Sequence, residues 1–435
     1  MKRWFVRRFT AAGKLVFIGI IVAACMGVDT NRAVAYQAFA FLALLMLLSM
    51  VASRYSKPCF SLRRSLPRHG SVGDVVNYTV TLLNLESRLQ RSLSYIEELK
   101  DPRPTLDEFA TTVEPKEKER NAVDRFFKFY RWSWILDRNL RGVVEEQEAL
   151  AIPAGGRAEL KLSLNPIRRG ILQLEGGTIA CPDPFGLYRS MVTSSHPDKI
   201  LILPRRYPLP PFDLPGSMRY QQGGVALASS VGESEEFASL RDYRHGDPIR
   251  RIHWKSWAKV GRPIVKEFQN EFFVRHALIL DTFCEAAHSE TFEEAVSIAA
   301  SLACTIDTQD SLLDLLFVGP QAYCFTAGRG LAHSQQMLEI LASVETCSNK
   351  VFESLDHLVI QHAASVSGCI CIFIAWDEER QQLLKKLQGL DIPTKIFLIT
   401  ESSAPRIDPA ELNLSRDDSF HQLDVGAIEE GLARV

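Results

Sequence analysis

Two long apolar runs occupy the start of the 435-residue chain. Residues 15–28 carry no charge. This run reaches a spanning length when residues 9–13 are added and Lys14 extends its ammonium to the headgroups. Residues 33–52 are uncharged throughout, and one helical crossing of a bilayer needs about 20 residues. The pattern predicts a transmembrane helical hairpin over residues 1–58.

Basic residues flank both outer ends of this hairpin, whereas the short connection holds Arg32 against Asp29. Because cytoplasmic flanks of membrane helices are rich in Lys and Arg, we expect a two-pass protein of the bacterial inner membrane with both termini cytoplasmic. The alternative is a cleaved signal peptide, for which Val22-Ala23-Ala24-Cys25 resembles a lipoprotein cleavage box. The second apolar run directly after it favours the hairpin. The flanking basic residues are Lys2, Arg3, Arg7, Arg8, Lys14, Arg54, Lys57, Arg63, Arg64 and Arg68.

Residues 59–210 show a pattern of short strands separated by Gly and Pro. Apolar and polar positions alternate in residues 76–82 and again in residues 160–164, as in half-buried strands. We expect Gly176-Gly177 to bend the chain and residues 197–204 to form a last strand. The pattern predicts an antiparallel β-sandwich of immunoglobulin type.

An insertion near residues 102–139 interrupts this pattern. Its centre, DRFFKFYRWSWILDR, interleaves six aromatic residues with Arg and Lys. Aromatic and basic residues close to a membrane anchor are typical of an element lying on the bilayer surface. An amphipathic element that packs on the sandwich has the same composition, so both interpretations stay open.

From about residue 268 onward, strand and helix patterns alternate. The strand at residues 272–281 contains a fully apolar stretch, as a parallel sheet covered on both faces requires. We expect residues 377–390 to form a helix capped by Asp377, and residues 394–400 to form the final strand. The pattern predicts an open, doubly wound, Rossmann-like α/β sheet, in which ligands bind at the carboxyl ends of strands. Asp281 lies at such an end.

Residues 235–268 read EEFASLRDYRHGDPIRRIHWKSWAKVGRPIVKEF, and this segment resembles the signature of the family called domain of unknown function 58. IRRGILQL, DPFGLYRS and ILPRRYPL resemble the family's lead-in. The resemblance implies a von Willebrand factor A-like domain within residues 211–435. It also implies genomic association with MoxR-type AAA+ ATPases and membrane transglutaminase-like proteins, and no established activity. The signature positions include Glu236, Phe237, Arg241, Tyr243, Gly246, Asp247, Arg250, His253, Trp254, Lys255 and Lys266.

A von Willebrand A domain usually binds a divalent metal through Asp-x-Ser-x-Ser after its first strand. Here Asp281 is present, but Phe283 and Glu285 replace the two serines. A phenyl ring cannot ligate, and Thr282 stands at the wrong spacing for several oxygens to converge on a hard cation. We therefore expect no metal and no other cofactor at this degraded motif.

The signature itself predicts a helix that begins at Asp247-Pro248 and stops at Gly261, because an acidic cap followed by Pro starts helices and Gly ends them. Its excess of Lys and Arg can bind an acidic partner, anionic lipid or nucleic acid. The alternative is an interdomain lock, in which Arg241 and Arg250 pair with acidic neighbours. No nucleic-acid motif is present, so nucleic acid is not the expected partner.

Composition and cysteine use add two constraints. The formal net charge is −2, so the whole chain is no polyanion binder by composition. The nine cysteines form no CxxC pair, which gives no sign of a zinc or redox motif and favours a reducing compartment.

Three functions remain open. The first is a membrane-anchored cytoplasmic adaptor that works with a MoxR-type ATPase in remodelling membrane or envelope complexes. The second is a hydrolytic enzyme that uses Asp281, His253 and Asp247. The third is a passive structural subunit of a membrane complex. No GxSxG, HExxH or P-loop sequence occurs, so the sequence favours the non-catalytic adaptor.

Overall fold

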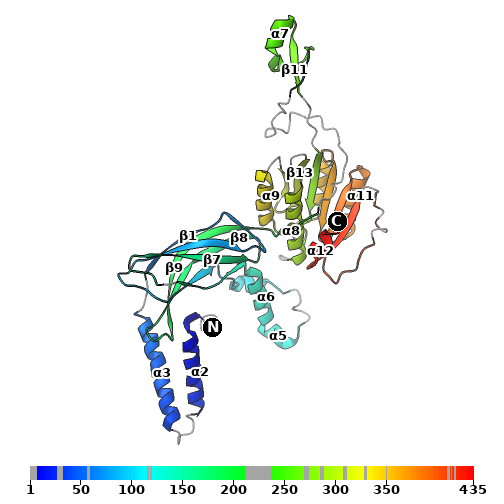
Figure 1. The fold of residues 1–435 in the computed structure, drawn as a ribbon. Coiled ribbons are helices and arrows are strands. Elements are labelled where there is room, and N and C mark those ends of the chain that lie inside the picture. Colours follow the sequence, from blue (N-terminus) through cyan, green and yellow to red (C-terminus); the bar gives the residue numbers. More distant parts are fainter. Residues whose placement is uncertain are drawn as a thin grey trace. The chain divides into compact units, whose positions relative to one another are not determined.

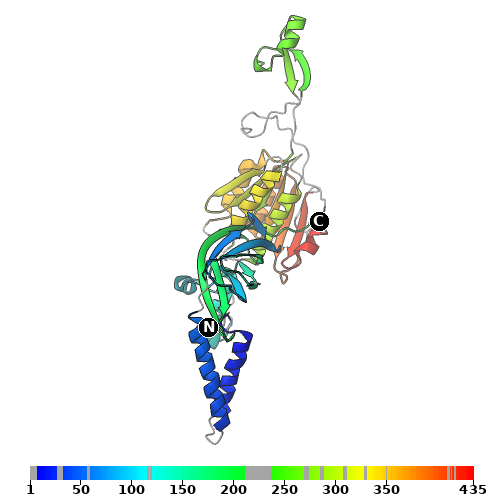
Figure 2. The same ribbon diagram turned by 60° about the vertical axis from the view of Figure 1, so that its left-hand side comes forward.

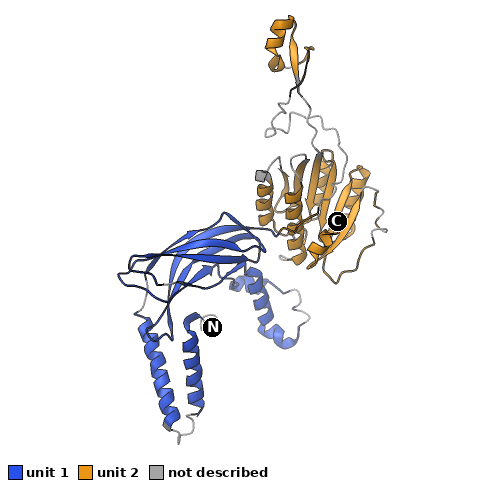
Figure 3. Cartoon of the chain, in the orientation of Figure 1, with its two compact units in different colours: residues 1–205 blue, residues 206–435 orange. Residues whose placement is uncertain are grey.

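The chain divides into two compact units, residues 1–205 and 206–435, which are described separately below (Figure 3). Tyr207, near the start of the second unit, packs within that unit, and its hydroxyl donates to the Glu294 carboxylate at 2.6 Å. The division at residues 58 and 210 expected from the sequence stays a prediction. The computed structural model describes residues 7–26, 33–55, 59–114, 117, 120–149, 151–210, 237–247, 249–268, 274–284, 289–306, 311–327, 331–348, 350–408, 412, 414–415 and 418–435.

Two apolar helices, α2 (Ala11–Met26) and α3 (Ala33–Ser53), lie side by side at the start of the first unit (Figures 1 and 2). Within the described part of the chain, one helix is long and apolar enough to cross a membrane, over Val34–Ser53 with mean hydropathy 2.1. Helix α2 is apolar but has 16 residues. The structure therefore supports one candidate span, and the two-pass hairpin stays a prediction.

The residues that lead into α2 are fixed to the β-sandwich. The Thr10 N–H donates to the Leu187 carbonyl at 3.2 Å, and the Phe9 ring meets the Tyr188 ring edge-on at 5.3 Å between centroids. A Cβ at Gly13 would lie 2.0 Å from the Leu187 carbonyl oxygen, so only glycine allows this approach. These contacts join the apolar helix pair to the sandwich.

Two sheets form the β-sandwich and share one core. The strands are antiparallel except for the pair β2–β9. The first sheet has the order β1 (Phe60–Ser65), β3 (Val76–Asn84), β7 (Arg157–Pro166), β5 (Gly142–Val144). The second has the order β2 (His69–Ser71), β9 (Arg189–Leu203), β8 (Gly170–Pro182), β4 (Leu93–Leu99), β6 (Gln147–Ala149).

The alternation in the sequence sets the inner face of the first sheet. Val80, Leu82, Leu162 and Leu164 are all buried, and the polar positions between them are more exposed. This agrees with the predicted half-buried strands, because side chains on a strand point to opposite faces in turn.

The expected bend at Gly176-Gly177 is wrong, because both glycines lie inside the long strand β8. The pairing register between β8 and β9 shifts between Leu174 and Gly176, as at a bulge. A Cβ at Gly177 would lie 2.5 Å from the Tyr95 ring. Gly177 therefore makes room for a buried phenol, Gly176 allows the close approach of the Ser194 carbonyl, and neither turns the chain.

Glu97 is a buried carboxylate inside the sandwich, and its hydrogen-bonding capacity is filled. The Arg64 guanidinium donates to it at 2.5 Å, and the hydroxyls of Tyr78 and Tyr95 donate at 2.9 and 3.0 Å. Burial, together with this carboxylate, raises the pKa of both tyrosines, so both remain proton donors. The charge of Arg64 is what makes a buried carboxylate tolerable here.

Replacing Arg64 by Met is expected to lower the free energy of unfolding by about 3–5 kcal/mol, because Glu97 then keeps an uncompensated buried charge. Hydrogen exchange of the amides in β3 and β4 measures the loss. The exposed neighbour Arg63 is the control, and Arg63→Met should change stability by no more than about 0.5 kcal/mol. Equal effects of the two substitutions on the free energy of unfolding would show that the buried pair of Arg64 and Glu97 contributes no more to stability than an exposed arginine.

The insertion forms three short helices, α4 (Leu106–Thr111), α5 (Ala122–Phe127) and α6 (Phe129–Asn139). Ile135 on α6 is fully buried. Arg131 is also buried and donates to Glu117 at 2.5 Å. Part of the insertion thus packs inward, while its aromatic end is exposed.

The second unit contains a six-stranded sheet that is parallel except for one edge strand, β14. Helices α8 (Glu290–Thr305) and α9 (Leu331–Ser343) pack on one face, and α10 (Glu353–Ala363) and α11 (Glu378–Gly389) on the other (Figure 1). The strand order is β14 (Ala322–Ala327), β13 (Ser311–Val318), β12 (Val274–Leu280), β15 (Gly368–Phe373), β16 (Thr394–Thr400), β17 (Ser419–Asp424). This is the doubly wound arrangement expected from the sequence.

One strand of this sheet was not predicted from the sequence. Residues 394–400 form β16, but β17 follows it and is the sheet edge, and α12 (Ile428–Leu432) packs beside it. The β17 sequence, SFHQLD, has no apolar run, and Leu423 is its one fully buried side chain among the described positions. An edge strand needs less apolar character than the buried strands, so the pattern did not reveal it.

Candidate functional site

Asp281 follows β12 at the point where the strand order reverses, between β12 and β15. Its backbone N–H still donates to the carbonyl of Ile372 at 3.0 Å, which holds it in the sheet. Its side chain is completely buried. In a doubly wound sheet this crevice is the usual place for a ligand.

Arg380, from the first turn of α11, lies at this position and contacts Asp281. Its guanidinium donates to both carboxylate oxygens of Asp281, at 2.9 and 3.1 Å. It also pairs with Asp377 and lies 4.5 Å above the centre of the Phe352 ring. Burial raises the pKa of the Asp281 carboxyl, and the arginine opposes that rise. The bidentate pair places a fixed positive charge where a cation would otherwise bind.

The neighbours of Asp281 complete a closed site. The Phe283 N–H donates to the carboxylate at 3.0 Å, while the Phe283 ring packs edge-on against Phe352 at 5.5 Å between centroids. The Thr282 hydroxyl donates to the Val318 carbonyl and so is already engaged. Among the residues that the structure describes, no three His, Cys, Asp or Glu side chains gather as metal ligands. Glu285 lies outside the described residues.

Arg380 was not predicted from the sequence. The one available signal is its position in the first turn of a helix, where a positive charge opposes the helix dipole and acidic residues are preferred. The Asp377 cap was predicted, and its side chain accepts the Arg380 N–H at 3.1 Å. An arginine in that turn needs a nearby carboxylate, and Asp281 supplies one 99 residues away in sequence.

Millimolar Mg²⁺ is expected to leave the thermal unfolding temperature of the protein unchanged, because Arg380 holds both oxygens of Asp281. A bound ion at a hundred times its dissociation constant would add about 2.7 kcal/mol of stability. Differential scanning calorimetry with Mg²⁺ and with a chelator measures this. Ca²⁺ serves as the second ion, and a stabilisation by either would contradict the closed site.

The signature folds as a small hairpin module, which we define as residues 237–268 (Figure 1). Strands β10 (Phe237–Asp242) and β11 (Ile264–Phe268) pair antiparallel, and between them lie η2 (Ile249–Arg251) and α7 (Trp254–Val260). Its small core is made of three apolar side chains that are each at least nine-tenths buried: Ile252, Ile264 and Val265.

The predicted single helix from Asp247 to Gly261 is wrong in its first half. Ile252 bridges Val265, and the His253 N–H donates to the Ile264 carbonyl at 2.8 Å, so the backbone breaks between η2 and α7. Pairing with β11 wins over continuing the helix. The predicted end is confirmed, because Gly261 takes the left-handed conformation at φ 76°. Pro248 lies outside the described residues.

Asp247 therefore has a different role from the predicted helix cap. Its carboxylate accepts two hydrogen bonds from the Arg241 guanidinium, at 2.7 and 2.8 Å, and one from the Arg244 N–H at 2.8 Å. The hydrogen bonds from Arg241 lower the pKa of Asp247 to about 2. The ion pair ties β10 to the turn at Gly246, whose φ is 105°. One of the predicted acidic partners of Arg241 is thus found.

The other signature residues divide between backbone and surface roles. Arg250, Trp254 and Lys255 are exposed, and the Trp254 ring is stacked on Trp257 at 5.2 Å with 60% of the residue accessible. The Nδ1 of His253 shares a hydrogen bond with the Ser256 hydroxyl at 2.6 Å. The remaining positions have backbone roles. The Tyr243 N–H donates to the Pro263 carbonyl, and in the β10–β11 strand register Lys266 lies opposite Leu240 and Phe237 opposite Phe268. Glu236 lies outside the described residues.

Asp247 is expected to remain ionised in the folded protein until the pH approaches about 2, as carbon-13 NMR of its carboxyl can show. Because this folded pKa lies below the ordinary 3.8, its contribution to stability is complete above pH 3.8 and is lost as the pH falls through about 2. Arg241→Gln should bring the titration back toward 3.8. Arg262→Gln, which breaks the exposed pair with Asp242, should not move it.

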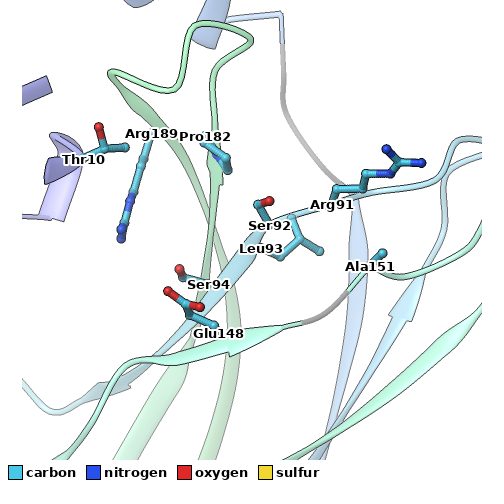
Figure 4. A pocket seen from close by; sticks show the side chains of 9 residues that line it. All are labelled: Thr10, Arg91, Ser92, Leu93, Ser94, Glu148, Ala151, Pro182 and Arg189. Carbon is cyan, nitrogen blue, oxygen red and sulfur yellow. The ribbon is translucent and has the colours of Figure 1, made fainter. Parts of the chain in front are cut away.

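The first unit also contains an open cavity of about 540 Å³ (Figure 4). Its lining is mixed in charge, with Arg189 and Glu148 facing it from the strands of the second sheet. Arg189 pairs with Glu146 at 2.6 Å. The lining contains no histidine or cysteine to act as base or nucleophile, so we assign no chemistry to this cavity. It is lined by Thr10, Arg91, Ser92, Leu93, Ser94, Glu148, Ala151, Pro182 and Arg189.

The fold and the signature module define a multidomain protein with a β-sheet-rich unit and a doubly wound α/β unit. Residues 239–381 match the family described as "Protein of unknown function DUF58", so the resemblance seen in the sequence is confirmed. The matched segment contains the hairpin module from Ser239 onward and both Asp281 and Arg380. Both candidate sites therefore belong to the part of the chain that the family shares.

Parts of the chain are similar to one curated protein and to solved structures. The "Uncharacterized protein YeaD" of Bacillus subtilis is 30% identical over 126 residues, which is 28% of this chain and 31% of that protein. The chain thus matches about a third of that relative's length. The solved VWA domain of SpRpn10 is similar at 12% identity, covering 38% of this chain and 98% of that one, with a TM-score of 0.27. The CARDB domain of PF1109 from Pyrococcus furiosus shows 10% identity, 34% and 90% coverage and a TM-score of 0.19.

Proposed function

We propose that this protein is a membrane-anchored, non-catalytic docking protein that presents the hairpin module to an acidic protein partner on the cytoplasmic side of the bacterial inner membrane. The observation that carries the proposal is that Arg250 and Trp254 are both exposed on the hairpin module, whose fold is held by contacts among its own residues. Arg and Trp are the side chains most often found at the centres of binding interfaces.

The internal contacts of the module support this role. Arg241 and Asp247 are engaged with each other, and the apolar residues Ile252 and Val265 are buried together. The stacked indole of Trp254, in contrast, projects an aromatic surface that its own module does not cover. Such a surface gains free energy when a partner removes it from water.

The carboxylates that an enzyme would need are already engaged. Asp281 is bound by Arg380, Asp247 by Arg241, and the Nδ1 of His253 by Ser256. General acid–base catalysis needs a titratable group within reach of a substrate proton. These contacts support a binding role over the hydrolytic alternative.

Membrane attachment rests on α3 and its flanks. The helix is apolar over a spanning length and is followed by basic residues, beginning with Arg54, which favours a cytoplasmic location for the rest of the chain. In the proposed topology α2 is the second span, so both termini are cytoplasmic. The β-sandwich would then lie against the inner leaflet, where the contacts of Thr10 with Leu187 hold it.

The family resemblance suggests which partner to test. It associates such chains with MoxR-type AAA+ ATPases and with membrane transglutaminase-like proteins. The chain has no P-loop, so ATP-driven work would come from the partner. We therefore propose an adaptor that brings a MoxR-type ATPase to membrane or envelope complexes.

Trp254→Ala and Arg250→Ala are expected to reduce recovery of the ATPase by about tenfold or more in a crosslinking pull-down from native membranes, as loss of an interface hot spot does. Circular dichroism first establishes that each variant is folded. Val351→Ala is the matched control, because Val351 is exposed and lies outside the module. It should leave recovery unchanged.

The other outcomes separate the alternatives. Full recovery with both variants would assign the module to holding domains together and would move docking elsewhere. If no AAA+ ATPase is recovered with the wild-type protein, the adaptor proposal fails and the passive structural subunit becomes the better hypothesis.

A further inference from the structure

The insertion in the first unit ends in an exposed aromatic turn, which we call the aromatic elbow and define as Phe126, Phe127, Lys128 and Phe129. Lys128 takes the left-handed conformation, with φ 51° and ψ 26°. It is at once the last cap of α5 and the first cap of α6. Lys128 thus separates two aromatic pairs: the Phe126 and Phe127 rings meet edge-on at 5.3 Å between centroids before it, and the Phe129 and Tyr130 rings meet at 5.9 Å after it.

The exposure of these rings is unusual for a protein surface in water. Phe126 is 80% exposed, Phe127 72% and Phe129 64%. A phenylalanine ring presents roughly 150–250 Å² of apolar surface, so three of them form a patch of the size that marks an interaction site. Ile135, further along α6, is by contrast fully buried. The elbow is thus the outward end of an otherwise packed element.

Two exposed cations and one half-buried carboxylate, Asp124, lie next to the elbow in the sequence, and three glutamates of the insertion are paired. The carboxylates of Glu114, Glu117 and Glu108 pair with arginines of the insertion at 2.5–2.6 Å. Arg125 and Lys128 are exposed beside the rings. Phenylalanines bracketed by two cations are complementary to an anionic bilayer surface, where rings enter the headgroup layer and cations meet phosphates.

The position of the insertion within the first unit agrees with this. The strand that leads into it, β4, carries Glu98, which pairs at 2.9 Å with Arg7 just before α2. Helices α5 and α6 extend from the sandwich on the same side as α2 and α3 (Figures 1 and 2). An elbow on that side would meet the bilayer that α3 enters.

We propose that the aromatic elbow inserts into the headgroup layer of the anionic bilayer that anchors the chain. It acts as a second, peripheral contact that fixes the orientation of the β-sandwich on the membrane. The proposal rests on the membrane anchor proposed above. It selects between the two roles that the sequence left open for this insertion: Ile135 packs inward, and the elbow faces lipid.

The test is photocrosslinking of the full-length protein in lipid nanodiscs of phosphatidylcholine with and without phosphatidylglycerol. The photoreactive amino acid p-benzoylphenylalanine replaces Phe127, or Phe129 in a second variant, and adducts are identified by mass spectrometry. Val351, exposed to a similar degree in the other unit, carries the probe as the control. We expect lipid adducts at both elbow positions that are enriched by phosphatidylglycerol, and none at the control.

Neutralising one cation should weaken the contact in a defined way. With the probe at Phe127, Lys128→Gln should lower the ratio of lipid-bound to free elbow about fivefold in anionic discs, the contribution of one cation near such a surface. It should have no effect in pure phosphatidylcholine. A yield that is equal in the two lipid mixtures would overturn the electrostatic part of the proposal.

Three further outcomes would each overturn the proposal. Adducts to protein and not to lipid, when the probe is used in native membranes, would make the elbow a protein-binding site. Absence of lipid adducts from protein that resists alkaline carbonate extraction would refute the elbow alone and leave the membrane anchor standing. Release of the protein by carbonate would instead refute the anchor of the proposed function.

Discussion

The buried pair of Asp281 and Arg380 is the interaction on which the α/β unit depends. It joins the end of the central strand β12 to the start of α11 across the point where the strand order reverses. Removing two charges from water costs several kcal/mol per ion, and the bidentate geometry with the added Phe283 and Ile374 N–H donors offsets that cost. The same pair occupies the crevice that this fold uses for ligands elsewhere. The carboxylate of Asp281 is therefore fully engaged by contacts within its own unit.

The periodic parts of the fold were predictable from the sequence. Alternation fixed the inner face of the sandwich, and fully apolar runs located the parallel strands, because burial on one or both faces leaves a direct mark on residue pattern. What failed were positions decided by contacts distant in sequence. Gly177 lies within a strand, where its missing side chain leaves room for the Tyr95 ring. The predicted helix is interrupted at His253 because the His253 N–H donates to the Ile264 carbonyl. Strand β17 was missed because an edge strand carries a weak apolar signal.

The candidate site was half predictable for the same reason. The sequence showed what Asp281 had lost, since Phe283 is not a ligand, but not what replaced it, since Arg380 lies 99 residues away. In the signature, the pairing of Arg241 with Asp247 was among the expected pairs. The helix that Asp247 was expected to cap did not form as one piece, because Ile252 and His253 pair with β11, and the Asp247 carboxylate accepts from Arg241 and the Arg244 N–H instead. A carboxylate that is already hydrogen-bonded to an arginine and a backbone N–H is not available to cap a helix, so the local preference for a helix start is not realised.

Both units pair a buried carboxylate with a buried arginine and leave aromatic groups exposed. In the sandwich, Glu97 takes all its hydrogen bonds from Arg64 and two tyrosines, yet Phe127 stands in the open next to Lys128. In the second unit, Asp281 is closed off, yet Trp254 lies exposed near Arg250. Satisfied buried charges make a rigid support, and rigid support lowers the entropy lost when an exposed aromatic group binds. This arrangement agrees with the two contacts proposed above, of the aromatic elbow with lipid and of the hairpin module with a protein.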